Sequence, residues 1–337
     1  MNKILKQINV MHFPAQPHFF SYGGFDIQMN RVIEMTNNEK IITKKVNLWS
    51  RKESFEIAHF WGASDSHKRN IIFCKDNGIK VIISGLFVQK TFKNRIKIKV
   101  WNIVRSFFHW KSVIFFADIV TVINEEQAEV VAKYHGFSRE KIKIIPTILD
   151  DKIFQYRKAK STKESFILCV GSILTRKNQN ILAQVAIDIG IKCVFIGRFD
   201  SREPLYKEQF LKIQNTSNGL IEQFEDITIE NLCTFYQQSS VVACLSQNET
   251  EPASILEGMH FKKPIIASNL PFAKNKKFSG IILCNQNSKK EIKEALKLAL
   301  KTNNIIYNRF NSRNNSSESV INLYNKAYQE LTQMDLI

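Results

Sequence analysis

Short apolar runs recur along the first half of the chain and predict the strands of a sheet. The runs span residues 8–13, 57–61, 80–83, 119–123 and 142–145, and stretches of helical character such as 25–35, 66–77 and 125–134 separate them. The runs are continuously apolar and do not alternate with polar residues, which is typical of parallel strands that helices cover on both faces. The pattern therefore predicts a doubly wound, Rossmann-like α/β domain.

The same rhythm restarts after the polar segment 156–164, which we interpret as a linker. The later apolar runs span residues 166–170, 193–196, 220–224, 241–245, 264–267 and 281–283. Beyond the polar run 311–317, apolar residues recur at helical spacing from Val320 to Leu331 and predict a closing helix. We therefore expect two Rossmann-like domains, 1–155 and 156–315, and a C-terminal helix within 316–337 that packs back toward the first domain.

Composition limits the class of protein. The 337 residues suffice for two domains, and 44% hydrophobic and 23% charged residues exclude a disordered or fibrous chain. No apolar run is long enough to span a membrane or to form a signal peptide. Six widely separated cysteines without a Cys-x-x-Cys pair predict buried thiols in a reducing cytoplasm and no metal site. The 48 basic and 31 acidic residues give a net charge of +17, which indicates an anionic partner.

The segment 241–269 carries the strongest chemical signal. A buried strand leads into a polar loop with Glu249 and Glu251, and a helix is expected to begin around Pro252. The first amides of that helix, at Ala253 and Ser254, would bind a diphosphate, because N–H groups at a helix start lack intrahelical acceptors and the dipole favours an anion. Glu257, one turn later, could accept hydrogen bonds from the hydroxyls of a ribose. The competing interpretation is that these acids are solvated surface residues.

Several segments together resemble family 4 (group 1) retaining glycosyltransferases of the GT-B fold. The family's hallmark is a pair of glutamates with seven residues between them, here Glu249 and Glu257, in a signature that also includes Ser246, Pro252, Leu256, Pro264 and Ser268. Residues 167–180, ILCVGSILTRKNQN, resemble the strand and loop that open its nucleotide-sugar domain, with Lys177 at the phosphate-binding lysine. Residues 117–150 resemble the end of its first domain, and Gly23-Gly24 resembles its glycine loop over the donor sugar.

The resemblance implies a glycosyltransferase of the hexosyltransferase type. Because no Asp-x-Asp pair occurs and Asp150-Asp151 falls in an expected connector, we expect no catalytic metal and no cofactor. The enzyme would move a sugar from a UDP- or GDP-linked donor, with retention, to a saccharide acceptor; lipid-linked acceptors of O-antigen or capsule-like surface polysaccharides are included. We expect the first domain to bind the acceptor and the second the nucleotide sugar. The catalytic candidates are Glu249, Lys177 and His59. The donor-binding candidates are Gly23, Gly24, Gly171, Ser172, Arg176, Lys177, Gly197, Arg198, Glu225, Glu249, Pro252, Ala253, Ser254 and Glu257.

The chain also departs from the family pattern. Ser172 stands where the family commonly has an arginine, and Gly85-Leu86 stands where a first-domain histidine often follows the strand. Arg176 could replace the missing arginine, although a residue adjacent to Lys177 should point elsewhere unless the backbone turns. His59 is the nearest alternative histidine, and a buried structural histidine is the competing interpretation. Because of these departures, a second interpretation stays open: a transferase homologue that binds nucleotide but has lost turnover.

A basic stretch at 89–111 leaves two interpretations open. It contains seven basic residues and no acid, and Phe92, Ile96, Val100, Ile103 and Phe107 recur at helical spacing. Such a helix can lie on an anionic membrane surface, but the pattern equally describes a helix that faces the core. A nucleic-acid-binding protein is the alternative that the net charge suggests, but no recognisable reading motif accompanies it. We therefore expect no nucleic-acid partner and a cytoplasmic protein that can be peripheral on the inner face of the cell membrane.

Overall fold

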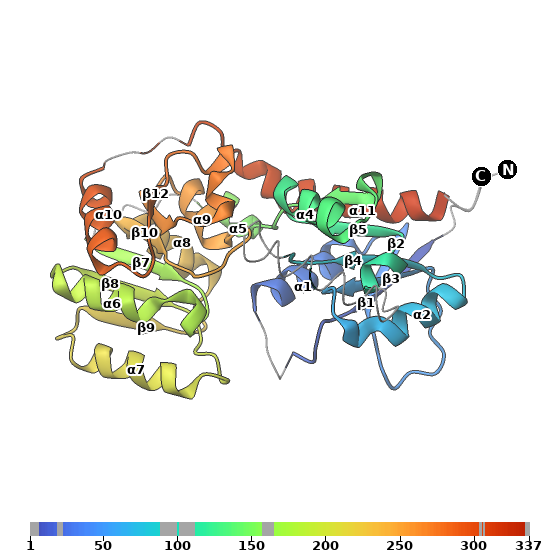
Figure 1. The fold of residues 1–337 in the computed structure, drawn as a ribbon, viewed down its shortest axis with the longest axis horizontal. Coiled ribbons are helices and arrows are strands. Elements are labelled where there is room, and N and C mark those ends of the chain that lie inside the picture. Colours follow the sequence, from blue (N-terminus) through green and yellow to red (C-terminus); the bar gives the residue numbers. More distant parts are fainter. Residues whose placement is uncertain are drawn as a thin grey trace. The chain divides into compact units, whose positions relative to one another are not determined.

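The computed structural model of the chain describes residues 7–18, 23–87, 100, 112–156, 165–302, 305 and 307–333. It divides into two compact units (Figure 1). The first comprises Met1–Ile148 and Asn314–Ile337, and the second comprises Leu149–Arg313. Most of the basic stretch 89–111 and of the expected linker 156–164 lies outside the described residues.

The first unit is built on a parallel sheet, of which the described residues contribute six strands in the order β2-β1-β3-β4-β5-β6. The strands are β1 (Ile8–Phe13), β2 (Ile41–Lys45), β3 (Ile57–Trp61), β4 (Lys80–Ser84), β5 (Ile119–Val122) and β6 (Ile142–Ile144). The apolar runs predicted all of them except β2. That strand lies at the sheet edge and ends in the exposed residues Lys44 and Lys45, so its sequence contains no continuous apolar run.

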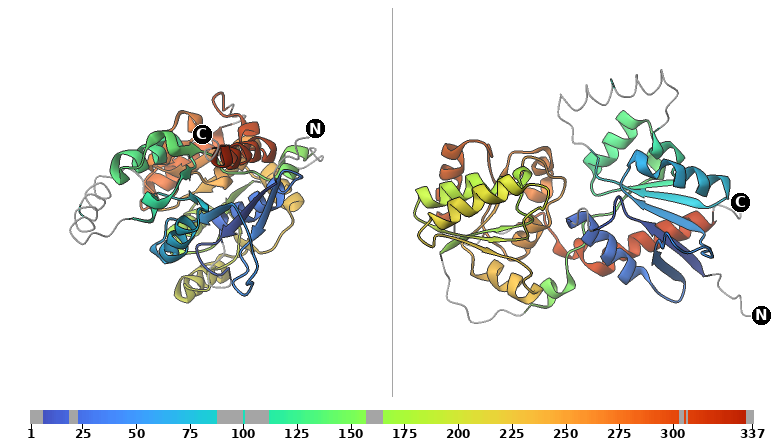
Figure 2. Two further views of the ribbon diagram at one scale, coloured as in Figure 1. Left: turned by 90° about the vertical axis from the view of Figure 1, so that its right-hand side faces the viewer. Right: turned by 90° about the horizontal axis from the view of Figure 1, so that it is seen from below.

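Helices cover both faces of this first sheet. The helices are α1 (Gly24–Thr36), α2 (Lys68–Asp76), α4 (Glu125–His135) and α11 (Ser317–Gln333). The apolar residues of α1 and α11 pack together in the core on one face, and those of α2 and α4 pack on the other (Figure 2). The expected closing helix is thus confirmed as α11, which packs on α1 and β1 and buries Tyr324, Tyr328 and Leu331.

The second unit repeats this architecture. Within the described residues its parallel strands follow the order β12-β11-β10-β7-β8-β9. The strands are β7 (Phe166–Val170), β8 (Lys192–Ile196), β9 (Ile221–Phe224), β10 (Val241–Cys244), β11 (Ile265–Ser268) and β12 (Ile282–Cys284). One face is covered by α6 (Gln179–Asp188), α7 (Pro204–Asn215) and α10 (Lys289–Lys301), and the other by α8 (Ile229–Gln238) and α9 (Ala253–His260). The prediction of two Rossmann-like, doubly wound parallel sheets is confirmed.

The second unit begins at Leu149, before the expected boundary at residue 156. Leu149 is fully buried in a cluster with Phe166 and Leu168 of β7. The short helix α5 (Asp151–Gln155) then packs on α8, where Lys152 Nζ lies 2.8 Å from Glu230 Oε1. Apolar packing therefore assigns this segment to the second unit. Among the described residues, no helix is long and apolar enough to cross a membrane.

The strand order shows where each sheet can hold a ligand. In open α/β sheets, ligands bind outside the carboxyl ends of the strands, at the point where the strand order reverses. In the second unit this point lies between β7 and β10, which pair with each other and lead to opposite halves of the sheet. The loops that follow these two strands contain Lys177 and Glu249.

Candidate functional site

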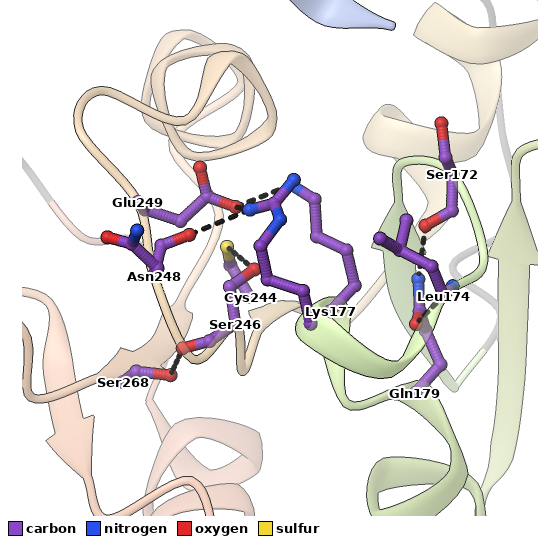
Figure 3. A network of polar contacts seen from close by, with 10 residues as sticks. Ser172, Leu174, Lys177, Gln179, Cys244, Ser246, Asn248, Glu249 and Ser268 are labelled. Carbon is purple, nitrogen blue, oxygen red and sulfur yellow. Dashed lines mark hydrogen bonds and ion pairs between the residues drawn. The ribbon is translucent and has the colours of Figure 1, made fainter. Parts of the chain in front are cut away.

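Two loops at the carboxyl ends of β7 and β10 bring three charged side chains together. After β7 the chain forms a 3₁₀ turn, Thr175–Lys177, and Asn178 at φ 62° leads into α6. Lys177 Nζ lies 2.5 Å from Oε1 of Glu249 (Figure 3). Arg176 Nη1 lies 3.3 Å from the same oxygen and donates to the carbonyl of Asn248 at 2.7 Å. The 3₁₀ turn therefore aims both adjacent cations at Glu249. The backbone turns here, so the condition under which Arg176 is expected to reach the site is met.

Main-chain and hydroxyl contacts hold the two loops together. The Gln247 N–H donates to the carbonyl of Arg176 at 2.7 Å, which joins the loop after β10 directly to the 3₁₀ turn. Ser268 Oγ at the end of β11 donates to the carbonyl of Ser246 at 2.7 Å (Figure 3). Both serines belong to the signature that the sequence shows: Ser268 contributes its hydroxyl to this contact and Ser246 its main-chain carbonyl. They fix the loop that carries Glu249.

The Lys177–Glu249 pair is ionised although it is mostly buried. The two side chains expose 18% and 11% of their surface. Burial is the largest single influence on the pKa of each group and favours its neutral form, but the partner's charge and the hydrogen bond between them outweigh it. The pKa of Lys177 is therefore raised and that of Glu249 is lowered. A buried ion pair of this kind is a typical mark of a functional site.

Two glycines let the loops after β7 and β8 approach closely. A Cβ atom on Gly197, whose φ is 154°, would lie 2.2 Å from the carbonyl oxygen of Gly171. The Gly171 N–H donates to the carbonyl of Ile196 at 2.9 Å, and a Cβ at Gly171 would lie 3.7 Å from Lys177 Nζ. Only glycine fits at Gly197, and the close approach sets the position of the loop beneath Lys177. Both glycines were donor-binding candidates.

Helix α9 begins as the sequence predicts. Pro252 is the N-cap in an extended conformation, and Ala253 and Ser254 form the first turn. Glu257 is 8% exposed, and one of its oxygens accepts a hydrogen bond from Tyr236 Oη at 2.6 Å. Tyr236 lies on α8, in a stretch that carries no motif, so no sequence signal pointed to this contact.

Glu251 is also buried. Its side chain has no exposed surface, and its carboxylate forms an ion pair with Lys277. Because Glu249, Glu251 and Glu257 are all buried and paired, the interpretation of these acids as solvated surface residues is wrong.

The remaining second-unit candidates lie on the loops after β7, β8 and β9. Arg198 forms an exposed ion pair with Asp226, with a distance of 2.5 Å. Gln223 Nε2 donates to the carbonyl of Gly197 at 2.8 Å and lies 3.2 Å from Oε1 of Glu225. The carbonyl of Ser172 accepts a hydrogen bond from Gln179 Nε2 at 2.9 Å (Figure 3). These candidates therefore share the carboxyl edge of the sheet with Lys177 and Glu249.

The two glycine candidates of the first unit lie at the start of α1. The Gly23 N–H donates to Asp26 Oδ2 at 2.9 Å. A Cβ atom at Gly23 or Gly24 would meet nothing within 4 Å. Among the described residues, none therefore crowds the start of this helix.

The structure does not support His59 as a catalytic residue. Its side chain is fully buried in the first unit. Its Nδ1 lies 2.8 Å from Tyr328 Oη and its Nε2 lies 2.7 Å from Ser84 Oγ, so both ring nitrogens are hydrogen-bonded. Burial, reinforced by the neighbouring ring of His12, lowers the pKa of His59 well below its usual value. His59 is a structural residue that connects β3 and β4 to α11.

Acidification should destabilise the first unit because two histidines are buried in neutral form. Burial lowers the pKa of His12 to about 3, and the pKa of His59 is also low. Below about pH 6.5 the unfolded chain binds protons that the folded unit cannot, so each histidine lowers the free energy of unfolding by about 1.4 kcal/mol per pH unit. For His12 this loss continues down to about pH 3. Urea unfolding at pH 7, 6 and 5, followed by tryptophan fluorescence, measures the effect, since all four tryptophans lie within residues 1–148.

A hydroxyl-deletion variant provides the control for this pH dependence. Tyr328→Phe removes the hydrogen bond to His59 but no group that titrates between pH 5 and 7. It should lower stability at every pH and leave the pH slope unchanged. Equal stability of the wild-type protein at pH 7 and pH 5 would contradict the buried-histidine explanation.

Within the described residues, no group of three or more His, Cys, Asp or Glu side chains is arranged to hold a metal ion. Metal independence and the absence of a cofactor remain predictions.

Solved structures with a similar fold include several enzymes of sugar metabolism. A glycosyltransferase from Rickettsia africae ESF-5 has a TM-score of 0.68 at 13% identity, with 97% of this chain and 99% of that chain covered. Alr3699/HepE from Anabaena, in complex with UDP-glucose, has a TM-score of 0.68 at 11% identity over 97% and 99% of the two chains. WaaG, a glycosyltransferase involved in lipopolysaccharide biosynthesis, has a TM-score of 0.57 at 11% identity over 98% and 96%. At such low identity these likenesses establish the fold.

Sequence comparison identifies the family. No curated protein sequence gives a significant match. The family described as glycosyl transferases group 1 matches residues 150–318, which is half of the chain and includes both Lys177 and Glu249. The chain therefore belongs to the group 1 glycosyl transferases and is a glycosyltransferase with the GT-B fold.

Proposed function

We propose that the protein is a retaining, metal-independent hexosyltransferase that uses a UDP- or GDP-linked sugar. The observation that carries the proposal is the buried ion pair between Lys177 and Glu249, 2.5 Å apart at the strand-order reversal of the second sheet. This is the place where an open α/β sheet holds a nucleotide. It lies inside the segment that the family matches.

The donor diphosphate would bind between a helix start and an ammonium group. The first-turn amides of α9, at Ala253 and Ser254, lack intrahelical acceptors and carry the positive end of the helix dipole. Lys177 supplies a full positive charge. As the bond to the sugar breaks, negative charge grows on the leaving phosphate, and these pre-positioned donors stabilise it. Glu257 would accept hydrogen bonds from the ribose hydroxyls.

Glu249 would hydrogen-bond the hydroxyls of the transferred sugar and fix its orientation. Its pKa is lowered, so the carboxylate is ionised and can only accept hydrogen bonds. It lies 2.5 Å from the ammonium group of Lys177, and donor binding would share that group between carboxylate and phosphate. We assign no enzyme nucleophile. As the family resemblance implies, the acceptor would attack the sugar on the same face from which the leaving group departs. The anomeric configuration would then be retained.

For the acceptor we propose a saccharide, lipid-linked, in the synthesis of a surface polysaccharide of O-antigen or capsule type. The resemblance to WaaG, which acts in lipopolysaccharide biosynthesis, supports this proposal, as does the net charge of +17, which suits an enzyme that works beside anionic lipid. The protein would then act in the cytoplasm, at the inner face of the cell membrane.

A thermal-shift panel of nucleotides and nucleotide sugars tests the proposal. A ligand at 100 times its dissociation constant stabilises a protein by about 2.7 kcal/mol, so the correct donor should raise the melting temperature measurably. Donor hydrolysis or transfer to a saccharide panel, followed by NMR of the product's anomeric centre, then tests turnover and retention. Stabilisation without any product would indicate a homologue that only binds nucleotide. Tight, salt-sensitive binding of nucleic acid with no response to nucleotide sugars would overturn the proposal.

A further inference from the structure

A tight turn after the edge strand β2 presents two large apolar side chains to solvent. The Ser50 N–H donates to the carbonyl of Asn47 at 3.1 Å, and the Trp49 N–H donates to Asn47 Oδ1 at 3.0 Å. These bonds close a turn with Leu48 and Trp49 at its tip. Leu48 is 79% exposed and Trp49 is 93% exposed, the highest exposures among the exposed large hydrophobic residues that the structure describes. The turn is therefore ordered, and its apolar tip contacts almost nothing.

Basic residues flank this tip on both sides. Lys44 and Lys45 precede it, and Arg51 and Lys52 follow it; all four are exposed, and no acidic residue occurs from 44 to 52. The Val46 N–H donates to the carbonyl of His12, which anchors the base of the segment to β1. Residues 44–52 thus carry four positive charges and no negative one, two on each side of an apolar tip in the sequence.

This combination has the chemistry of a contact with an anionic bilayer. Tryptophan is favoured at membrane interfaces because its ring is apolar and its N–H is polar. Lys and Arg close to an anionic bilayer gain electrostatic energy, and apolar side chains gain by entering the acyl boundary. A saccharide that stacks on Trp49 would leave the four cations unexplained. A nucleic acid would leave Leu48 in water.

We propose that residues 44–52 dock the first unit onto an anionic membrane surface, with Leu48 and Trp49 inserted at the interface and the four cations against lipid headgroups. The inference extends the proposed action on lipid-linked acceptors by naming the segment that meets the membrane. The inference rests on the proposed function, because docking would bring the enzyme to a lipid-linked acceptor. Its test uses no donor or acceptor, so the docking surface and the transferase activity fail or succeed separately.

A fluorescent label at the tip tests the docking directly. All six native cysteines are buried, so Leu48→Cys provides a uniquely reactive thiol for an NBD label in the full-length chain. Phosphatidylcholine vesicles that contain phosphatidylglycerol should shift the NBD emission to the blue and raise its intensity, and pure phosphatidylcholine vesicles should not. Ser201→Cys, at an exposed site of the second unit, is the labelling control and should not respond.

Two variants measure the contributions to binding in a vesicle co-sedimentation assay. Each Lys or Arg near an anionic surface contributes a factor of about five to partitioning, so Arg51→Gln with Lys52→Gln should weaken binding about 25-fold. Trp49→Ala should weaken it about tenfold if roughly 60 Å² of apolar surface enters the bilayer. Lys289→Gln with Lys290→Gln removes the same charge from exposed positions of the second unit and should have little effect.

Three results would overturn the proposal. One is co-sedimentation of the protein with anionic vesicles while the label at position 48 does not respond, since another segment would then make the contact. A second is an equal loss of binding in the two double variants, which would show only a general charge effect. The third is a response of the label to single-stranded DNA but not to vesicles.

Discussion

Replacement of Lys177 by alanine should lower the turnover of the donor sugar about 10²- to 10³-fold. Lys177 and Arg176 both contact Glu249, and the Lys177 side chain is the less exposed of the two, at 18% against 45%. Its ammonium group would face the charge that develops on the leaving phosphate. Loss of one such pre-positioned donor costs about 3 to 4 kcal/mol of transition-state stabilisation. Steady-state kinetics with the donor identified by the thermal-shift panel measures the change. Lys192→Ala is the matched control, because Lys192 forms a more exposed ion pair with Glu222 in the same unit.

Loss of the lysine also leaves a buried carboxylate without its main partner. Burial alone raises the pKa of Glu249, so in the Lys177→Ala variant this pKa should rise and the second unit should lose stability. Melting temperatures are therefore measured beside the rates, and Lys177→Arg, which keeps the charge, should recover part of the activity. A folded Lys177→Ala protein with near-normal kcat/KM would remove Lys177 from the mechanism.

The element pattern could be predicted from the sequence because the central strands of both sheets are buried on both faces. Short, mostly apolar runs marked each strand except β2, an edge strand that ends in two exposed lysines. The unit boundary could not be placed as well, because α5 is short and polar and its assignment depends on its packing against α8. Sequence patterns record burial and periodicity, but they do not record which remote element a short segment contacts.

In the candidate site, too, the sequence predicted the residues that lie in motifs but not the contacts between remote elements. Two segments of the sequence located these residues: Lys177 and Glu249 lie on the loops that follow β7 and β10, and Glu257 lies one turn into α9. The contact of Arg176 with Glu249 depends on a 3₁₀ turn that the sequence did not predict. The partners Tyr236 and Lys277 lie on other elements and bear no motif.

His59 illustrates the opposite error. A histidine in a strand beside the expected active site was an attractive catalytic candidate, but its environment is set by α11, which lies at the far end of the sequence. Only the structure shows that Tyr328 and Ser84 occupy both ring nitrogens.

Replacement of Glu249 by glutamine should separate sugar positioning from nucleotide binding. The substitution keeps the shape of the side chain and removes its charge, so the hydroxyls of the donor sugar would lose a charge-assisted acceptor. We expect kcat to fall about 10²- to 10³-fold, while the affinity for the nucleoside diphosphate itself changes little near neutral pH. Rates with the full donor, together with calorimetric titration of the nucleoside diphosphate, give the two quantities. Glu230→Gln, which removes an exposed ion-pair carboxylate of the same unit, should leave both unchanged.

The same variant makes a second, signed prediction through Lys177. Burial lowers the pKa of this lysine, and the charge of Glu249 is the main influence that raises it. In Glu249→Gln that influence is gone, so the pKa of Lys177 should fall and the ammonium should lose its proton at a lower pH than in the wild-type protein. Affinity for the nucleoside diphosphate should then decline with rising pH earlier in the variant than in the wild type. Parallel pH profiles for the two proteins, or an equal loss of nucleotide affinity and turnover at pH 7, would show that Glu249 does not act on the sugar while Lys177 holds the phosphate.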